Sequence, residues 1–377
     1  MIYLDNAATT LQKPPEVGQH ILAALATCAG YARSGHAPAL RSGETVFRCR
    51  ESAAALFDAA DPSQVVFTMN ATHALNLAIH ALCPDGTVTA VSGYEHNSVT
   101  RPLFARKRAV IILRSRLFDP ADFLMQAERA IEEGARLFVI NHVSNVFGSI
   151  APLAALDALL ISHNIPMILD ASQSAGVLPI SLRKLPSVAA VCMPGHKALM
   201  GPQGTGILIA CREELGPALL QGGTGSLSAD LEQPNFLPDH FESGTPNVPG
   251  IAGLCAGLDY ILRIGTEKIG AHESHLAQRL MDGLEKIDHL QVFRASDASN
   301  QTGVVSVRSE KITVEDLAAA LDGEGVCVRA GLHCAPVAHE TAGTIATGTV
   351  RLSVGWYNNE AEIDQTIFSF KKIMSNL

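Results

Sequence analysis

The amino-acid sequence predicts an α/β fold, with a large domain built on a mainly parallel seven-stranded sheet and a smaller α+β domain at the C-terminal end. Three observations support this prediction. Apolar runs rich in β-branched residues alternate with longer helical patterns through most of the 377 residues, and this alternation is typical of right-handed crossovers between parallel strands. The hydrophobic fraction is 47% and aromatic residues contribute only 5%, which suits closely packed layers. The chain is also too long for one small domain.

The strands expected in the large sheet are short and apolar. Leu137–Ile140 and Met167–Leu169 are uninterrupted apolar runs, as expected of strands that helices cover on both faces. The other candidates are apolar, β-branched runs between turn signals: Val65–Thr68, Val88–Val91, Val110–Leu113, Ala189–Cys192 and Gly206–Ile209. We expect helices between these strands, among them Glu44–Phe57, Thr72–Leu82, Ala121–Glu133 and Leu153–His163.

The alternating pattern breaks between Gln221 and Gly250, a stretch rich in Gly, Pro, Ser and Asn. It is too long for an idle connection and therefore predicts a functional loop. A long helical region follows, from about Ile251 to Ile287. The smaller domain is expected after it, from strands at Gln291–Phe293, Val304–Val307, Val326–Arg329 and Val350–Ser353, a helix near Val314–Leu321 and a last helix from Glu360.

Composition disfavours several functional classes. The formal net charge is −9, without a block of Lys and Arg, so nucleic acid is a poor candidate partner. The N-terminus lacks the pattern of a secretion signal, and no apolar run reaches the roughly 18 residues that would predict a membrane span. The eight cysteines include no C-x-x-C pair. We therefore expect reduced thiols in a cytoplasmic enzyme, with no disulfide framework and no metal site.

Two residues at strand ends together indicate a cofactor. Asp170 ends an expected buried strand, where α/β sheets bind ligands, although a capping role is the alternative. Lys197 follows the next strand among apolar and glycine residues; burial would lower its pKa and make it a Schiff-base lysine, whereas a solvated loop lysine is the alternative. A carboxylate for a ring nitrogen and an amine for an aldehyde are what pyridoxal phosphate requires. The glycines around Lys197 would let the backbone approach such a flat cofactor.

A cofactor of this kind also needs a phosphate site and a residue that stacks on its ring. Met69–Asn76 joins a strand to a helix, so its free N–H groups and the Thr72 hydroxyl could bind an anion, although most such turns are only helix caps. His96 follows the strand Val88–Val91 and could stack on the ring and handle protons. The alternative for His96 is a residue at a helix start or on the surface.

A second reactive group is expected near residue 334. Cys334 lies between a strand end and a proline, with Arg329 and His333 close in sequence, and an electropositive setting of this kind favours thiolate. A metal site made from His333 and Cys334 would lack a second ligand pair. Arg351 in the next strand offers a guanidinium for a substrate carboxylate, with a structural salt bridge as the alternative.

Together these segments resemble the class V aminotransferase family and, within it, the cysteine desulfurases with a short R-x-G-x-H-C-A loop. The resemblance covers nearly the full chain, and its motifs follow in this order: Tyr3–Thr10, Glu95–Asn97, His142–Gly148, Asp170–Gln173, His196–Gly206, Phe241–Asn247, Arg329–Ala335 and Arg351–Asn358.

The resemblance implies fold type I and a homodimer whose active sites lie at the subunit interface. It implies a large domain that binds pyridoxal 5′-phosphate, residues 15–262, and a small domain formed by residues 1–14 and 263–377. Lys197 resembles the Schiff-base lysine, and Asp170 resembles the partner of the ring nitrogen. The other implied cofactor contacts are Gln173 to the phenolic oxygen, His96 stacked on the ring, Asn145 near cofactor and substrate carboxylate, and a phosphate site of Ala71, Thr72 and His196 with Thr245 from the neighbouring subunit.

The implied activity is the conversion of L-cysteine to L-alanine, in which sulfur passes to Cys334 as a persulfide and then to an acceptor protein. Lys197, Cys334 and His96 would be the catalytic residues, and Arg351, aided by Arg329, would join Asn145 in binding the substrate carboxylate. A selenocysteine lyase and a β-eliminating C–S lyase of the same family are alternatives, and a non-catalytic scaffold is disfavoured by the intact set. An NAD-binding enzyme is disfavoured because Gly201–Gly206 does not read G-x-G-x-x-G.

Two segments depart from the family pattern. Pro194-Gly195 stands where many relatives carry Ser or Thr, so one phosphate-binding hydroxyl is expected to be missing. Gly222–Ser226 replaces the more familiar glycine-glycine-acid loop over the active site, which leaves the sulfur acceptor open.

Overall fold

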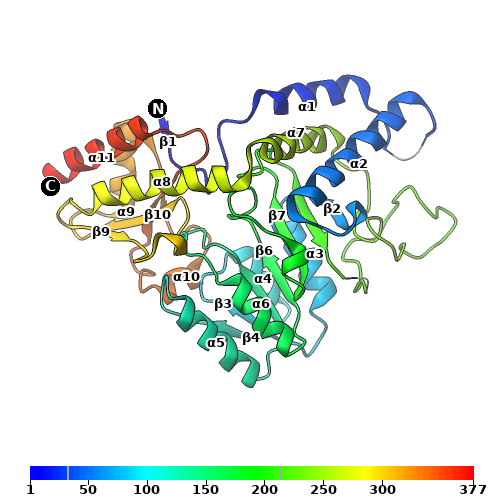
Figure 1. Ribbon diagram of the computed structural model, residues 1–377, viewed down its shortest axis with the longest axis horizontal. Coiled ribbons are helices and arrows are strands. Elements are labelled where there is room, and N and C mark those ends of the chain that lie inside the picture. Colours follow the sequence, from blue (N-terminus) through cyan, green and yellow to red (C-terminus); the bar gives the residue numbers. More distant parts are fainter. Residues whose placement is uncertain (32–33, 213) are drawn as a thin grey trace.

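The computed structural model describes residues 1–31, 34–212 and 214–377. Its central sheet has seven strands in the order β2-β8-β7-β6-β5-β3-β4 (Figure 1). These strands are β2 (Val65–Thr68), β3 (Val88–Ser92), β4 (Ala109–Leu113), β5 (Leu137–Asn141), β6 (Met167–Asp170), β7 (Val188–Pro194) and β8 (Gly206–Ala210). Only β8 runs antiparallel to its neighbours in this sheet. The predicted mainly parallel sheet is confirmed.

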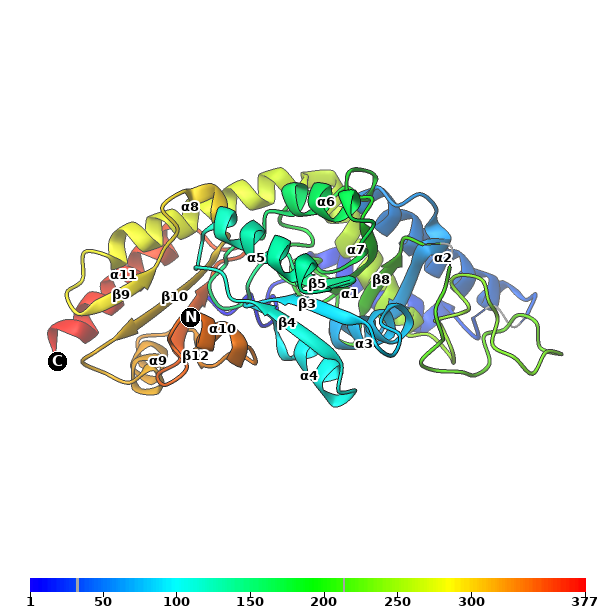
Figure 2. The same ribbon diagram turned by 90° about the horizontal axis from the view of Figure 1, so that it is seen from below.

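Helices cover both faces of the central sheet, and successive strand residues point to opposite faces. Phe138 and Ile140 of β5 pack in the core under one helical layer, whereas Leu137 and Val139 pack in the core under the other. The first layer contains α2 (Ala37–Phe57), α5 (Pro120–Glu132), α6 (Leu153–Ser162) and α7 (Val248–Ile264); the second contains α3 (Ala71–Leu82) and α4 (Asn97–Ala105). Figure 2 shows α5 and α6 on one side of the sheet and α3 and α4 on the other. The helix α1 (Pro15–Thr27) packs on α7.

The C-terminal part has its own sheet and its own core. Its four antiparallel strands lie in the order β12-β13-β10-β9, with α8 (Thr266–Leu284), α9 (Val314–Gly323) and α11 (Glu360–Ser375) contributing to a separate apolar cluster. The remaining bounds are β1 (Ile2–Tyr3), β9 (Leu290–Phe293), β10 (Val304–Ser309), β11 (Val326–Cys327), β12 (Arg329–Gly331), α10 (Pro336–Thr341) and β13 (Thr349–Ser353). Leu4 belongs to this cluster and β1 pairs with β11, so the first residues of the chain pack with the C-terminal part.

Two expected elements of the C-terminal part are wrong in detail. The long helical region expected from about Ile251 to Ile287 consists of two helices, α7 and α8, bent by 82° at Gly265, whose φ is +91°. Such a left-handed residue ends a helix, and the apolar periodicity resumes directly after it. The strand expected at Val326–Arg329 is two strands in different sheets: β11 pairs with β1 and β12 pairs with β13. An apolar run does not reveal that its pairing partner changes at Val328.

No single helix among the described residues is long and apolar enough to cross a bilayer. Only α7 and α8 taken together reach that length and composition, and they are sharply bent where they meet.

Residues 214–247 form a long segment without helices or strands. The loop predicted from Gln221 to Gly250 lies in this segment, except for its last three residues, which form the start of α7. The segment is nevertheless well anchored. Both ring nitrogens of the buried His240 lie at hydrogen-bond distance from backbone carbonyls, 2.7 Å from Pro234 and 2.8 Å from Gly216. Glu242 forms a buried bidentate ion pair with Arg50 of α2, at 2.8 and 2.6 Å. The end of the loop is therefore fixed on the central domain.

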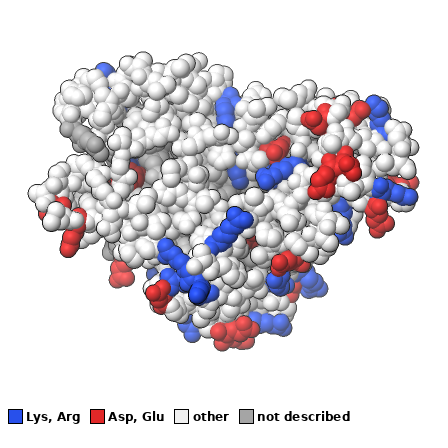
Figure 3. Space-filling model, turned by 180° about the vertical axis from the view of Figure 1, so that it is seen from behind, with Lys and Arg blue, Asp and Glu red and all other residues white. Residues whose placement is uncertain are grey.

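Charged side chains of both signs are interspersed over the face seen in Figure 3. The part of that face formed by α1, α2 and the 214–247 segment carries few of them. Several large apolar side chains of α1 and α2 are exposed, namely Leu22, Leu25, Leu40 and Phe47.

Candidate active site

A cavity of about 220 Å³ lies at the carboxyl ends of the parallel strands, against the C-terminal part. The predicted site residues line it, except Cys334 and Thr245. The lining comprises Ala7, Ala8, Asn70, Ala71, Thr72, His96, Ser98, Asn141, Val143, Asn145, Asp170, Ser172, Gln173, Pro194, His196, Lys197, Arg329, His333 and Arg351. Residues from both ends of the chain thus meet those that follow β2, β3, β5, β6 and β7.

Lys197 stands on a tight turn after β7. The turn is closed by backbone hydrogen bonds of 2.8 Å, from Met200 N to the Lys197 carbonyl and from Gly201 N to the Gly195 carbonyl. The Lys197 side chain faces the cavity, and no described residue forms a hydrogen bond or ion pair with its amine. Burial lowers the Lys197 pKa to about 8; the charge of Asp170 opposes this shift and that of Arg351 reinforces it. With a pKa of about 8, roughly a tenth of this amine is neutral at pH 7, compared with less than about a thousandth for an ordinary lysine.

Asp170 is the last residue of β6 and is only 4% exposed. Its Oδ1 accepts a hydrogen bond of 2.9 Å from Ser172 N; a turn and not a helix follows it, so this oxygen makes the contact of a loop aspartate and the helix-cap alternative is wrong. Burial raises the Asp170 pKa, while the Ser172 hydrogen bonds and the charge of Lys197 oppose that shift. The carboxylate also lines the cavity, which leaves its second oxygen free for a cationic partner.

His96 combines the two roles considered for it. It is the N-cap of α4, where its Nδ1 accepts a hydrogen bond of 3.1 Å from Ser98 N. Its ring also lines the cavity. Burial, together with the charges of Lys197 and Arg329, lowers the His96 pKa to about 4. The ring is therefore neutral at physiological pH.

A ring of polar groups surrounds the start of α3. Asn70 caps this helix by accepting from His73 N at 2.9 Å, so the cap interpretation of the turn is correct. Thr72 Oγ1 lies 2.7 Å from Ser98 Oγ, and both residues line the cavity. His196 also lines it, and burial lowers the His196 pKa to about 4. Two hydroxyls, a neutral imidazole and helix N–H groups thus surround one end of the cavity, as an anion site would require.

Gly195 and Gly201, in the lysine turn, lie where neighbouring protein atoms leave no room for a side chain. A Cβ on Gly195 would lie 2.2 Å from Thr205 Oγ1, and a Cβ on Gly201 would lie 2.8 Å from Leu254 Cδ1. Both positions need glycine because protein packs against them. The expectation that they serve close approach to a cofactor is wrong for these two residues.

Arg351 and Asn145 form the opposite end of the cavity. Arg351 is 1% exposed, and its guanidinium donates to Asp5 Oδ1 at 2.6 Å and to the Asn145 carbonyl at 3.0 Å. The salt-bridge alternative is therefore correct, and Arg351 also lines the cavity. Within the described chain, Arg351 Nε and Asn145 Oδ1 are buried without hydrogen-bond partners. Unpaired buried polar atoms of this kind are costly, so this end is suited to a polar ligand group.

Cys334 lies outside the cavity lining, on the loop between β12 and α10, and its side chain is exposed. Its neighbours Arg329 and His333 do line the cavity, and Arg329 Nη2 lies 3.8 Å from Cys334 Sγ. His333 and Cys334 both have left-handed backbone, with φ of 50° and 56°. The Cys334 carbonyl accepts a 2.8 Å hydrogen bond from Asn97 N, which ties the loop to the residue after His96.

The remaining predicted residues take different places. Gln173 lines the cavity and donates through Nε2 to the Ala7 carbonyl at 3.0 Å. Thr245 is exposed on the 214–247 segment and does not line the cavity of its own chain.

Reasoning from the sequence missed the N-terminal arm and Ser98. Ala7 and Ala8 line the cavity, and Thr9 Oγ1 and Lys13 Nζ donate to the His196 carbonyl at 3.1 and 2.7 Å. The motif Tyr3–Thr10 is part of the family resemblance, but the sequence alone did not indicate a role for it in the site. Ser98 had a weaker signal, since it follows His96 by two residues.

The model of the aminotransferase class-V family matches residues 2–366. A probable cysteine desulfurase from Methanothermobacter thermautotrophicus is 31% identical over 96% of this chain and 92% of its own. One from Xylella fastidiosa is 33% identical over 99% of this chain and 91% of its own. Among solved structures, a cysteine desulfurase from Thermococcus onnurineus superimposes with a TM-score of 0.92 at 30% identity, covering 100% of this chain and 95% of that one. The cysteine desulfurase CsdA from Escherichia coli gives a TM-score of 0.87 at 25% identity with the same coverage.

Proposed function

The chain belongs to the aminotransferase class-V family, and we propose that it is a cysteine desulfurase that uses pyridoxal 5′-phosphate to convert L-cysteine to L-alanine. The observation that carries this proposal is the pairing of Lys197 and Asp170 in one cavity, at the ends of adjacent strands, with Cys334 beside the residues at its edge. The relatives named cysteine desulfurase support the same activity.

The cavity fits this cofactor at each of its functional ends. Lys197 would hold the aldehyde carbon, and Asp170, with one free carboxylate oxygen, would pair with the ring nitrogen. Gln173 would reach the phenolic oxygen, His96 would stack on the ring, and Asn145 would lie beside it.

The phosphate would lie at the start of α3, held by Ala71, Thr72 and His196. We add Ser98 to this set because its hydroxyl lies 2.7 Å from Thr72 Oγ1 in the same cavity. Ser98 would supply the hydroxyl that Pro194 lacks. Thr245 of a neighbouring subunit would complete the site, since this residue lies outside the cavity of its own chain.

When bound, pyridoxal phosphate supplies an electron sink for negative charge at the substrate α-carbon. Arg351, with its unpaired Nε, would bind the substrate carboxylate together with Asn145 and Arg329. Lys197, released from the cofactor, would act as the base that takes the proton from the substrate α-carbon and then as the acid that gives it back. His96, neutral and close to Ser98, would hold a proton for the leaving product.

Sulfur transfer itself is proposed to use Cys334. The Cys334 thiolate would attack the sulfur of the substrate, so that a sulfur–sulfur bond forms and the substrate carbon–sulfur bond breaks. The electron pair of the broken bond would stay with the three-carbon framework, which takes up a proton and leaves as alanine. Cys334 would then carry a persulfide. Its exposed position would allow a second thiol, in an acceptor protein or a small molecule, to remove the outer sulfur.

The proposed enzyme is a homodimer in the cytoplasm. Exposed apolar side chains on α1 and α2 and the outlying Thr245 support a second subunit on that side. A persulfide chemistry needs reduced thiols, and all eight cysteines are free. Sedimentation analysis tests the dimer, and a monomer that retains full activity would reject it.

Product analysis tests the proposed reaction. The purified protein, loaded with pyridoxal phosphate, would be incubated with L-cysteine and a thiol reductant, and alanine, pyruvate and sulfide would be quantified. We expect alanine and sulfide in equal amounts. Pyruvate and ammonia in place of alanine would identify a β-eliminating C–S lyase, and turnover of selenocysteine without turnover of cysteine would identify a selenocysteine lyase.

A further inference from the structure

We propose that a second pocket, behind the lysine turn, binds a small organic cation that carries a primary ammonium or a guanidinium group. The pocket has a volume of about 210 Å³ and lies where the N-terminal arm, the lysine turn, α8 and the C-terminal segment meet. Its lining consists of Met1, Tyr3, Asn6, Thr10, Leu11, Gln12, Ala198, Met200, Glu273, Trp356, Tyr357, Asn358 and Glu362. The inference does not depend on the proposed desulfurase activity.

The central observation is the carboxylate of Glu273 on α8. Glu273 is 7% exposed, and no described side chain or backbone group forms a hydrogen bond or ion pair with it. Its neighbours on the helix are engaged: His272 Nε2 lies 2.9 Å from the Asn358 carbonyl and His275 Nε2 lies 2.8 Å from Glu360 Oε1. A buried carboxylate is normally paired, and burial alone raises the Glu273 pKa to about 8. The pocket thus contains a buried carboxyl group, that of Glu273, which has no partner among the described residues.

The charge of the pocket points the same way. Glu362 is a second carboxylate in the lining, and its Oε2 accepts hydrogen bonds from Asn358 Nδ2 at 2.9 Å and from Asn359 N at 3.2 Å. The lining includes no Lys, Arg or His side chain. Apart from the Met1 amine, the ionisable groups in the lining are acids and tyrosines, so a cation that pairs with the deprotonated carboxylates is favoured over an anion.

The aromatic lining favours an organic cation over a metal ion. Tyr3, Trp356 and Tyr357 contribute rings to the pocket, and ring faces attract ammonium and guanidinium groups. The polar atoms of Tyr3 and Trp356 are already used, because Tyr3 donates to the Thr9 carbonyl at 2.9 Å and Trp356 donates to Tyr260 at 3.0 Å. Among the described residues, no group of three or more His, Cys, Asp or Glu side chains is placed to hold a metal ion, and only two carboxylates line this pocket. A weakly hydrated organic cation is the better match.

An occupant of this pocket would touch both parts of the molecule. Ala198 and Met200 belong to the turn of Lys197, whereas Glu273 and Glu362 belong to helices that pack together in the C-terminal part. Figure 1 shows α8 running from α7 toward α11, alongside the C-terminal sheet. A bound cation would therefore hold the lysine turn against the C-terminal part and stabilise the assembled state.

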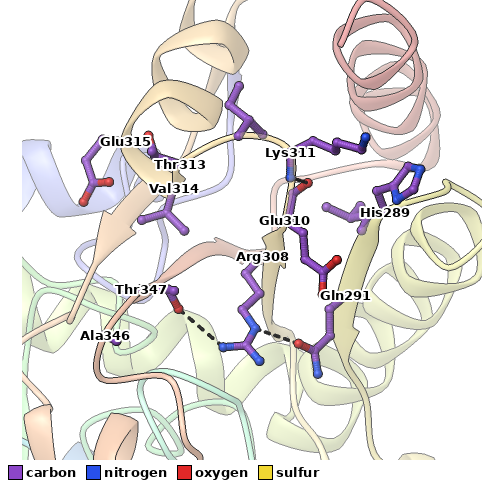
Figure 4. A pocket seen from close by; sticks show the side chains of 13 residues that line it. His289, Gln291, Arg308, Glu310, Lys311, Thr313, Val314, Glu315, Ala346 and Thr347 are labelled. Carbon is purple, nitrogen blue, oxygen red and sulfur yellow. Dashed lines mark hydrogen bonds between the residues drawn. The ribbon is translucent and has the colours of Figure 1, made fainter.

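A larger hollow, of about 850 Å³, lies between β9, β10 and the start of α9 and carries no such inference (Figure 4). The guanidinium of the half-buried Arg308 already has hydrogen-bond partners, because it donates to Gln291 at 2.6 Å and to Thr347 at 3.4 Å. The other charged side chains of the hollow, Glu310, Lys311 and Glu315, are exposed and of both signs.

The test is calorimetric titration of the full-length protein, loaded with pyridoxal phosphate, with n-butylammonium and n-butylguanidinium. Given the binding limit for small ligands, we expect a Kd of about 0.1–1 mM. Uncharged n-butanol should bind at least about tenfold more weakly. Glu273→Gln should weaken the cations about tenfold or more, and Glu267→Gln, on the first turn of the same helix, should leave binding unchanged. Equal binding of butanol, or cation binding that Glu273→Gln leaves intact, would overturn the proposal.

The unmodified protein offers an independent measurement. Since Glu273 has a pKa of about 8, it must lose a proton to pair with a cation, so affinity should be about tenfold lower at pH 7 than at pH 9. The other titratable groups at the pocket are Tyr3, Tyr357, Glu362 and the Met1 amine, with His272 beside Glu273 on α8. Affinity that does not change across this range would contradict the assignment to Glu273. Cysteine turnover and cofactor absorbance, measured in parallel, report separately on the proposed function.

Discussion

The lysine turn and the cysteine loop serve the same cavity but are built in opposite ways. Lys197 follows a fully buried strand and is surrounded by protein that lowers its pKa. Cys334 is exposed on a loop of the C-terminal part. Under the proposed function, the two residues would need opposite environments. An amine that forms a Schiff base benefits from desolvation, whereas a cysteine that carries sulfur would have to remain open to a second molecule.

The backbones of the two segments differ as well. The lysine turn relies on glycine where neighbours crowd it, at Gly195 and Gly201. The cysteine loop holds two consecutive non-glycine residues, His333 and Cys334, in left-handed conformation, which costs about 1–3 kcal/mol for each residue. Three contacts hold it: His333 Nε2 to the Thr349 carbonyl at 3.1 Å, Asn145 Nδ2 to the His333 carbonyl at 2.9 Å, and Asn97 N to the Cys334 carbonyl. Surrounding residues, not local preference, fix the cysteine.

The largest effect is expected at Lys197. Lys197→Ala should abolish alanine release, by more than about 10⁴-fold, because it removes both the covalent anchor and the proton-transfer group. Borohydride reduction followed by peptide mass spectrometry should place the coenzyme on Lys197 of the unmodified protein. The matched control is Lys13, whose pKa burial also lowers to about 8. Reductive trapping of the coenzyme on Lys13 would contradict the contrast between the lysine turn and the cysteine loop, because the reactive amine would then belong to the N-terminal arm.

Cys334→Ala should prevent sulfur transfer without affecting cofactor binding. We expect cysteine-dependent alanine release to fall by more than about 10²-fold while the yellow absorbance of the bound cofactor stays unchanged. Cys327→Ala, a half-buried thiol on β11, serves as control and should retain activity. Alanine production that survives Cys334→Ala would show that this loop does not accept the sulfur.

His333→Ala should have an intermediate effect because it removes one of the three contacts that hold the strained loop. We expect kcat to fall about tenfold with little change in KM, and the alkylation rate of Cys334 by iodoacetamide to change as the thiol loses its fixed position. His333→Asn should recover part of the loss, since Asn tolerates left-handed backbone and keeps a donor. If the alkylation rate and kcat stay at their original values, the loop is held without His333.

The smallest effect is a shift in pH dependence. Uptake of pyridoxal phosphate by the cofactor-free protein should accelerate as pH rises through about 8, since only the neutral amine of Lys197 reacts with the aldehyde. Asp170 raises the Lys197 pKa and Arg351 lowers it. Asp170→Asn should therefore move the midpoint to lower pH and Arg351→Gln to higher pH, as followed by stopped-flow absorbance. Shifts in the reverse directions would contradict this electrostatic account.

Much of the fold could be predicted because apolar periodicity reports burial directly. The central strands are found where their apolar runs lie, and α3, α5 and α6 begin within one residue of the expected positions. The helix expected from Glu44 begins earlier, at Ala37. The errors occurred where the chain changes direction or changes its pairing partner, because apolar periodicity reports neither. It continues across Gly265 although the chain turns by 82°, and it runs through Val328 although the strand pairs change sheet there.

The candidate site could be predicted only where one residue type signals its own chemistry. Lys197, Asp170 and Arg351 stand out because charged groups are rarely buried. Ser98 does not stand out, and its contact with Thr72 depends on how α3 and α4 are placed. The contacts of Thr9 and Lys13 with the His196 carbonyl join residues far apart in sequence, which no local pattern reveals.

The pairing of β1 with β11 also has a consequence for how the protein is made. Ile2 lies beside Val326, so a ribosome that adds about 5–20 residues per second needs roughly 16–65 s to synthesise the partner of the first strand. Throughout that interval β1 lacks its partner strand, although the contacts of Ala7 with Gln173 and of Thr9 with His196 can form earlier. Because Arg329, His333 and Arg351 also line the cavity, its closure is among the last events of biosynthesis, and the nascent central domain carries the cavity open on one side until then.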